Sequence, residues 1–138
     1  MVIALVGNQG EGKSEFCKQY IKRSSKPFLY YYKPNSEDFF KAEVKPGYIY
    51  CVDDAQSYLP LNPQDKRVKN VLGLLSQRRW KELTFFFCFH SFPQVPPWLI
   101  TYIDRYVVYK NELSAGSHQL NKAIKQVNSM PPQSFVIV

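Results

Sequence analysis

Short apolar runs alternate along this chain with segments in which apolar residues recur at helical spacing. Continuous runs rich in β-branched and aromatic residues are typical of buried strands, whereas apolar residues three and four positions apart are typical of helices packed on one side. These patterns predict strands over residues 1–6, 27–33, 47–53, 84–90, 105–110 and 135–138. They predict helices over residues 13–23, 66–81, 97–103 and 118–127, and a loop over 34–46 with one helical turn near 38–41.

The order of these elements indicates the fold class. Strands that are apolar on both faces and alternate with helices are typical of a parallel sheet covered by helices on both sides. The length of 138 residues suits one domain, and no repeat, low-complexity tract or linker interrupts it. We therefore predict a single α/β domain over residues 1–138, a three-layer sandwich with a mainly parallel sheet.

The segment between the first strand and the first helix, GNQGEGKS, fits the pattern G-x-x-x-x-G-K-[ST] in the strand–loop–helix context that this pattern requires. Glycines let successive backbone N–H groups turn inward onto phosphate, and the helix N-terminus adds the positive end of its dipole. The predicted nucleotide-binding residues are Gly7, Asn8, Gln9, Gly10, Glu11, Gly12, Lys13, Ser14 and Glu15. We expect Lys13 to act in catalysis on the β- and γ-phosphates, and the Ser14 hydroxyl to bind Mg²⁺.

A pair of carboxylates follows the apolar run YIYCV. Asp53 is placed at the carboxyl end of the predicted strand over residues 47–53, where it would hold Mg²⁺ together with Ser14. Asp54 follows at once and is placed to act as the general base that polarises the attacking water.

Together these two motifs resemble the P-loop ATPases that have an additional strand and a catalytic acidic residue after the metal-binding aspartate. In that class a further strand lies between the P-loop strand and the aspartate strand, and a polar residue at its tip senses the γ-phosphate. The strand over residues 84–90 matches this place, with His90 or Ser91 at its tip.

The segments SQRRWKEL and FFFCFHSFPQVPPWLITYIDRYVVYK narrow the resemblance to the HerA/FtsK superfamily of DNA-pumping ATPases. Its relatives include virion packaging ATPases and the Zot-like assembly proteins of filamentous phages, and the resemblance covers roughly residues 1–110. In the family, an arginine of one subunit reaches the γ-phosphate held by its neighbour, and Arg79 matches that place, with Arg78 as the alternative. Many members carry glutamate where this chain has Asp54, and glutamine where it has His90.

The resemblance implies an ATP-hydrolysing motor that translocates or packages viral or phage DNA into a capsid. It implies ATP and Mg²⁺ as cofactors, a homo-oligomeric ring of five or six subunits, and a location in the cytoplasm of an infected host cell or on the virion. A motor of this kind docks on a capsid vertex or on assembly proteins, and the aromatic and proline-rich segment 92–98 is the predicted docking surface.

The charge balance favours a polyanionic partner. Lys and Arg number 18 against 11 Asp and Glu, which gives a net charge of +7 and favours nucleic acid first and an anionic membrane surface second. Residues 66–81 hold six basic residues and no acidic one: Lys66, Arg67, Lys69, Arg78, Arg79 and Lys81. Such a face suits non-specific contact with DNA phosphates, and the alternative is a solvated basic surface.

The aromatic residues 30–32 either stack on bases or belong to the core.

Other functions remain open at this point. A small P-loop kinase needs arginines in a lid, and residues 111–116 contain none; a nucleotide-gated assembly adaptor would turn over slowly. A GTPase is disfavoured because no guanine-reading N-K-x-D segment follows a late strand, although nothing in the sequence identifies the base. The three cysteines lack metal-ligand spacing, and Cys51 and Cys88 lie in apolar strand-like runs, where cysteine usually acts as a small hydrophobe; this suits a reducing cytosol. No apolar run reaches 18 residues, so no membrane span is expected.

Overall fold

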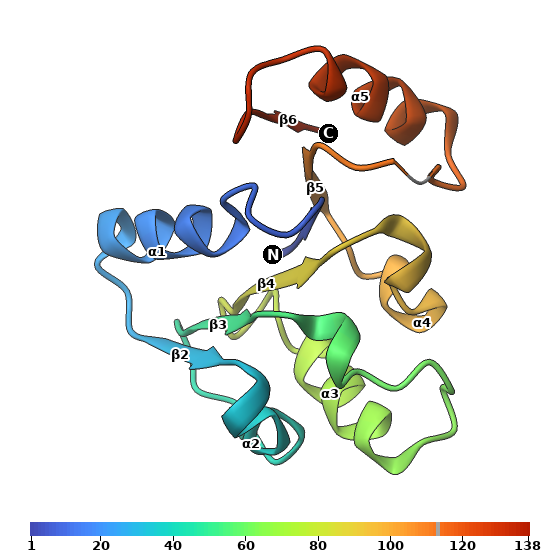
Figure 1. Cartoon of the computed structure of the whole chain (residues 1–138). Coiled ribbons are helices and arrows are strands. Elements are labelled where there is room, and N and C mark those ends of the chain that lie inside the picture. Colours follow the sequence, from blue (N-terminus) through green and yellow to red (C-terminus); the bar gives the residue numbers. More distant parts are fainter. Residues whose placement is uncertain (113) are drawn as a thin grey trace.

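The computed structural model describes residues 1–112 and 114–138. Its six strands form one sheet in the order β2-β3-β4-β1-β5-β6, in which all neighbours pair in parallel except β5 and β6 (Figure 1). The strands are β1 (Val2–Val6), β2 (Phe28–Tyr31), β3 (Ile49–Val52), β4 (Thr84–Phe89), β5 (Arg105–Tyr109) and β6 (Phe135–Ile137). The strand β4 lies between β1 and β3, as predicted from the additional-strand arrangement.

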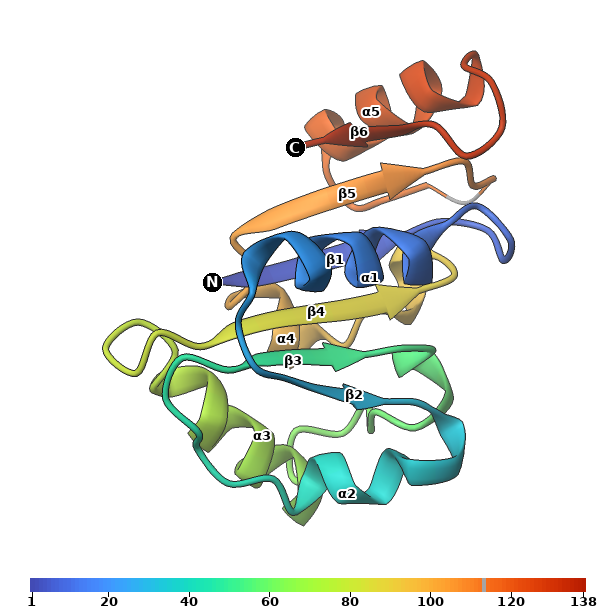
Figure 2. The same ribbon diagram turned by 90° about the vertical axis from the view of Figure 1, so that its left-hand side faces the viewer.

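Helices cover the two faces of the sheet unequally. The helix α1 (Lys13–Ser24) lies alone on one face, across β1 and β4 (Figure 2). The other face packs against α2 (Ser36–Phe40), α3 (Lys66–Ser76), α4 (Pro97–Ile100) and α5 (His118–Asn128). The predicted three-layer α/β sandwich is therefore confirmed.

The core has two layers that follow from strand alternation. On the α1 side, Cys17 and Ile21 of the helix pack with inward residues of β1, β3 and β4 such as Leu5 and Phe86. The larger layer on the opposite side is dominated by aromatic rings of β3 and β4, with Tyr50 stacked on Phe85 at a centroid separation of 4.9 Å. Because β1 and β4 are buried on both faces, they read in the sequence as continuous apolar runs.

Several predicted boundaries were wrong. The helix predicted over residues 66–81 ends at Ser76, because the chain then makes a series of tight turns in which Leu83 N–H donates to the Arg78 carbonyl at 2.8 Å and Glu82 takes a φ of 56°. The helix predicted over 97–103 ends at Ile100 for a similar reason, since Thr101 and Tyr102 form a turn.

The expected loop over residues 34–46 contains more helix than one turn. A 3-10 turn (Lys33–Asn35) leads directly into α2. Two further 3-10 turns lie outside this loop, at Ala55–Ser57 and Phe92–Gln94. Burial drives the formation of α2, because Phe39 and Phe40 both enter the core on the α3 side of the sheet. The strands β2 and β3 are also shorter than predicted.

Candidate functional site

The predicted phosphate loop joins β1 to α1 and is fixed at both neighbouring strands. Gly7 N–H donates to the Phe89 carbonyl of β4 at 3.1 Å, and Asn8 N–H donates to the Lys110 carbonyl after β5 at 2.8 Å. Gly7 touches Tyr109 so closely that a Cβ at this position would overlap the tyrosine Cβ and lie 3.0 Å from its carbonyl carbon. Only glycine fits there, which explains the first fixed position of the motif in physical terms.

The far side of the loop uses glycine for a different reason. Gly10 and Gly12 have φ values of 85° and 98°, in the left-handed region that L side chains rarely adopt. Gly12 is the N-cap of α1, and no side chain caps this helix end. The first N–H groups of α1 are therefore available to an anion, as the motif requires.

Lys13 and Ser14, the first two residues of α1, point into the loop. The Lys13 ammonium donates to the carbonyls of Gly7 at 2.5 Å and Asn8 at 2.9 Å, and burial lowers its pKa from the ordinary lysine value. The Ser14 hydroxyl donates to Asp53 Oδ2 at 2.7 Å. Residues that lie 39 positions apart in the sequence thus meet at the carboxyl edge of the sheet.

Asp53 is held from four directions. Tyr30 of β2 donates its hydroxyl to Asp53 Oδ2 at 2.5 Å, and Tyr58 donates to the Asp53 carbonyl oxygen at 2.8 Å. The Asp54 N–H donates to Asp53 Oδ1 at 3.0 Å, and Ser14 completes the set. Burial, with the Asp53 carboxylate adding to it, raises the pKa of both tyrosines well above the usual range, so both stay protonated donors.

The chemistry of this donor set suits magnesium. Mg²⁺ prefers oxygen ligands and is usually bound by one or two carboxylates together with substrate phosphates. The Ser14 hydroxyl and the Asp53 carboxylate provide such oxygens side by side. Across residues 1–112 and 114–138, no group of three or more His, Cys, Asp or Glu side chains is arranged to hold a metal.

The predicted base and sensor contact one another. Asp54 follows β3, His90 follows β4, and His90 Nε2 lies 3.1 Å from Asp54 Oδ1. Asp54 takes a φ of 50°, in the left-handed region, and it is exposed. A cavity of about 370 Å³ brings the predicted groups together; its lining includes Lys13, Ser14, Asp53, Asp54 and His90.

The two arginine candidates lie elsewhere. Both belong to the turns just before β4, at the end of this strand opposite His90, and neither lines the cavity. Arg78 is engaged locally, because its Nη1 donates to the Leu75 carbonyl at 2.9 Å and its guanidinium lies 5.2 Å from the centre of the Tyr102 ring. Arg79 is exposed, and so is the neighbouring Trp80, 74% of whose surface is accessible to solvent.

Two further predictions about surfaces change with the structure. The basic segment is partly compensated, because Arg67 forms an ion pair of 2.9 Å with Asp65, the N-cap of α3. The segment 92–98 is only partly exposed: Phe92 and Val95 are buried and the Trp98 indole donates to the Pro60 carbonyl at 2.8 Å, whereas Pro93, Gln94 and Pro97 are exposed. Its role as a docking surface stays a prediction.

The three tyrosines of residues 30–32 lie in different environments, because successive side chains of a strand point to opposite faces. Tyr31 enters the core, Tyr30 binds Asp53, and Tyr32 is exposed. The three cysteines are free and buried, as expected for Cys51 and Cys88, and Cys17 Sγ lies 3.8 Å from Cys88 Sγ. Among the described residues, every helix is too short or too polar to cross a bilayer.

Sequence reasoning missed Tyr30 and Tyr58. A usable signal existed for Tyr30, since a parallel pairing of the second and third strands places residue 30 near the end of β3. No comparable signal marks Tyr58, because it reaches Asp53 through a 3-10 turn that follows β3.

Comparison with known proteins gives structural likeness without sequence likeness. No protein-family model matches the sequence, and no curated protein matches it. The genome packaging NTPase B204 from Sulfolobus turreted icosahedral virus 2 superposes with a TM-score of 0.67 in complex with ATP-gammaS and 0.69 in complex with AMP, at 13% and 14% identity. B204 from Sulfolobus turreted icosahedral virus, described as the DNA-packaging ATPase, gives 0.67 at 11% identity. Each alignment covers 99% of this chain and 90% of the other, so this chain has the fold of these packaging NTPases.

Proposed function

We propose that this protein is an ATP-hydrolysing motor of viral genome packaging that works as a homo-oligomeric ring. The observation that carries the proposal is the meeting of Lys13, Ser14, Asp53, Asp54 and His90 in one cavity at the N-terminus of α1. The likeness in fold to the B204 packaging NTPases, one of them in complex with ATP-gammaS, supports it. Placement in the HerA/FtsK superfamily, and a location in the infected cell or on the virion, belong to the same proposal.

Five residues of the cavity have a part in the proposed reaction: Lys13, Ser14, Asp53, Asp54 and His90. The N–H groups of the loop and Lys13 would bind the β- and γ-phosphates, and Ser14 and Asp53 would hold Mg²⁺, which neutralises phosphate charge. Asp54 takes a proton from the attacking water, whose oxygen bonds to the γ-phosphorus as the bond to the ADP oxygen breaks and its electron pair leaves with ADP. His90 is within reach of Asp54 and orients it toward the water.

The position of Arg79 supports a ring. The six residues of β4 span about 20 Å, so Arg79 at one end of this strand is too far from the cavity at the other end to act within its own subunit. Its exposure fits a role on a neighbour's γ-phosphate, where such an arginine contributes a factor of about 10³–10⁵ in rate. Arg78 is the weaker candidate because its guanidinium is occupied by Leu75 and Tyr102.

The exposed lysines of α3 support contact with DNA. Lys66 and Lys69 are exposed on the first turns of this helix, and Lys81, which is partly buried, follows it. Charges of this kind contact phosphates and do not read sequence, as a translocating motor requires.

The test is the ATPase rate per subunit measured against protein concentration, with and without double- and single-stranded DNA, using Lys13→Ala as the blank. We expect the rate to rise with concentration and again with DNA. Mixing Arg79→Ala with Asp54→Asn subunits should restore part of the activity, because each variant supplies the group that the other lacks.

The outcomes separate the alternatives. A rate that depends on neither concentration nor DNA would refute the ring motor and favour a self-contained enzyme such as a small kinase. Nucleotide binding with negligible turnover under all conditions would favour an assembly adaptor that nucleotide switches. Absence of rescue in the mixed assemblies would remove Arg79 from its role.

A further inference from the structure

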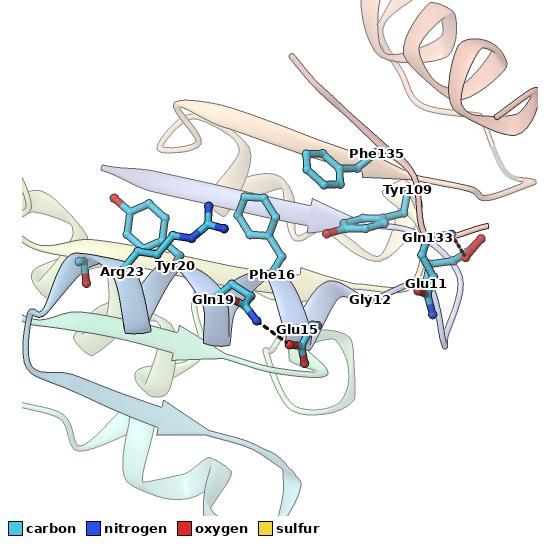
Figure 3. Close-up of a pocket in the computed structure, with 11 residues that line it drawn as sticks. Glu11, Gly12, Glu15, Phe16, Gln19, Tyr20, Arg23, Tyr109, Gln133 and Phe135 are labelled. Atoms are coloured by element: carbon cyan, nitrogen blue, oxygen red, sulfur yellow. Dashed lines mark hydrogen bonds between the residues drawn. The ribbon is translucent and has the colours of Figure 1, made fainter. Parts of the chain in front are cut away.

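A second and larger cavity lies between α1 and the β5–β6 edge of the sheet (Figure 3). Its volume is about 840 Å³, and its lining comes from the phosphate loop, α1, the end of β5 and the segment that enters β6. Gly12 and Glu15 line this cavity and the phosphate cavity alike. The two cavities therefore adjoin at the first turn of α1.

Three aromatic rings form a corner near this junction. Phe135 of β6 meets Phe16 edge-on, at a centroid separation of 5.4 Å and an interplanar angle of 88°, and it meets Tyr109 at 5.6 Å (Figure 3). Phe135 remains 40% exposed although it touches both rings. A nucleobase stacks well on aromatic faces of this kind, whatever its identity.

The corner is held at a fixed position relative to the phosphate loop. Tyr109 belongs to β5, and its Cβ lies against Gly7, the first residue of the motif. On the opposite wall, Phe16 follows Ser14 by two residues on the same helix. Bound phosphates and the aromatic corner are thus kept in register by β5 and α1.

Polar groups line the path between the two cavities. Glu11 accepts a hydrogen bond from the Gln133 N–H at 3.1 Å, and Gln19 donates to Glu15 at 3.1 Å (Figure 3). These residues surround the place where a ribose would pass from the phosphates to the aromatic corner. A mainly apolar cavity with a few convergent polar groups is typical of a small-molecule site of this volume.

We propose that this cavity holds the nucleoside of the bound nucleotide, with its base stacked on the exposed ring of Phe135 and bounded by Phe16. The proposal rests on the proposed function, because it requires the triphosphate to bind at Lys13. It adds a site for the base, which the phosphate motif itself does not supply.

The test compares two ligands by calorimetry: MgATP, and magnesium tripolyphosphate, which has the phosphates but no nucleoside. Phe135→Ala should weaken MgATP binding about ten- to hundredfold, the range expected from loss of aromatic stacking. Its binding of tripolyphosphate should not change. Phe28→Ala is the matched control, since Phe28 is an exposed phenylalanine on β2, the opposite edge strand, and lines neither cavity.

Each outcome decides a separate point. If Phe135→Ala weakens the binding of both ligands equally, or of neither, the nucleoside site is overturned and the proposed function stands. The nucleoside site is also overturned if the wild-type protein binds tripolyphosphate as tightly as ATP. In that case a peptide of a neighbouring copy is the next occupant of the cavity to test. Wild-type protein that binds neither ligand would overturn both proposals. If Phe135→Ala fails to fold, Phe135→Leu keeps apolar volume without a ring and serves in its place.

Discussion

Tyr30 provides a direct test of how the candidate metal site is held. Its hydroxyl and that of Ser14 donate to the same oxygen of Asp53, at 2.5 and 2.7 Å. Tyr30→Phe removes this one donor and leaves the ring in place. A hydrogen bond to a charged acceptor contributes about 1.5–3 kcal/mol, and because both side chains are only partly buried we expect the low end, about 1.5 kcal/mol. This free energy corresponds to roughly a tenfold loss of Mg²⁺ affinity. That is the lower limit seen when a side chain that hydrogen-bonds to a metal ligand is removed.

The assay is steady-state ATP hydrolysis against free Mg²⁺ at fixed ATP. We expect Tyr30→Phe to raise the apparent KM for Mg²⁺ about tenfold, with little change in the rate at saturating Mg²⁺, because the hydroxyl orients the metal ligand and does not touch the reacting atoms. Tyr48→Phe is the control, since the Tyr48 ring packs beneath the Lys45 ammonium, 5.4 Å from it. An unchanged Mg²⁺ dependence, or a lower maximal rate with an unchanged KM, would refute this account of Tyr30.

Three other perturbations follow from the structure. Gly7→Ala should lower the free energy of unfolding by about 1–3 kcal/mol through overlap with Tyr109, whereas Gly73→Ala on the open face of α3 should raise it by about 0.5–1 kcal/mol, both measured by urea denaturation. Asp54→Asn should preserve ATP binding, since asparagine tolerates the left-handed backbone, and should slow hydrolysis by about 10²–10⁴; unchanged turnover would remove Asp54 as the base. Burial raises the pKa of Tyr50 and Tyr109, so their contribution to the unfolding free energy should be constant below the ordinary tyrosine pKa of 10.0 and fall as the pH rises above it, because these tyrosines ionise more readily in the unfolded chain. In urea titrations from about pH 8 to about pH 11, the unfolding free energy of Tyr50→Phe and of Tyr109→Phe should fall less steeply above about pH 10 than that of the wild type, and an equal slope would mean that these rings are open to water.

The parts of the fold and site that sequence reasoning reached share a physical basis. The phosphate loop could be predicted because its chemistry is local: glycines, one lysine and one hydroxyl lie within eight residues. The position of β4 between β1 and β3 followed from resemblance and is confirmed. The roles of Lys13, Asp54 and His90 in catalysis stay predictions, although the structure brings the three side chains to one cavity.

What could not be predicted depends on tertiary register. Tyr58 reaches Asp53 only through the 3-10 turn that follows β3. The aromatic cavity needs Phe135 from β6 to return antiparallel beside β5, more than a hundred residues after Phe16. The early end of α3 has a similar origin, since the residues after Ser76 turn so that the chain can enter β4.

The strand β4 has mechanical consequences for a ring. His90 follows its carboxyl end and Arg79 precedes its amino end, while β1 and β3 flank it on both sides. Because β4 is paired along its length with β1 and with β3, it cannot slide past either neighbour, and its two ends keep a fixed separation. In the proposed ring, His90 and Arg79 would therefore belong to one rigid body. Any rotation of a subunit that changed the position of its catalytic cavity would move its arginine by the same rotation.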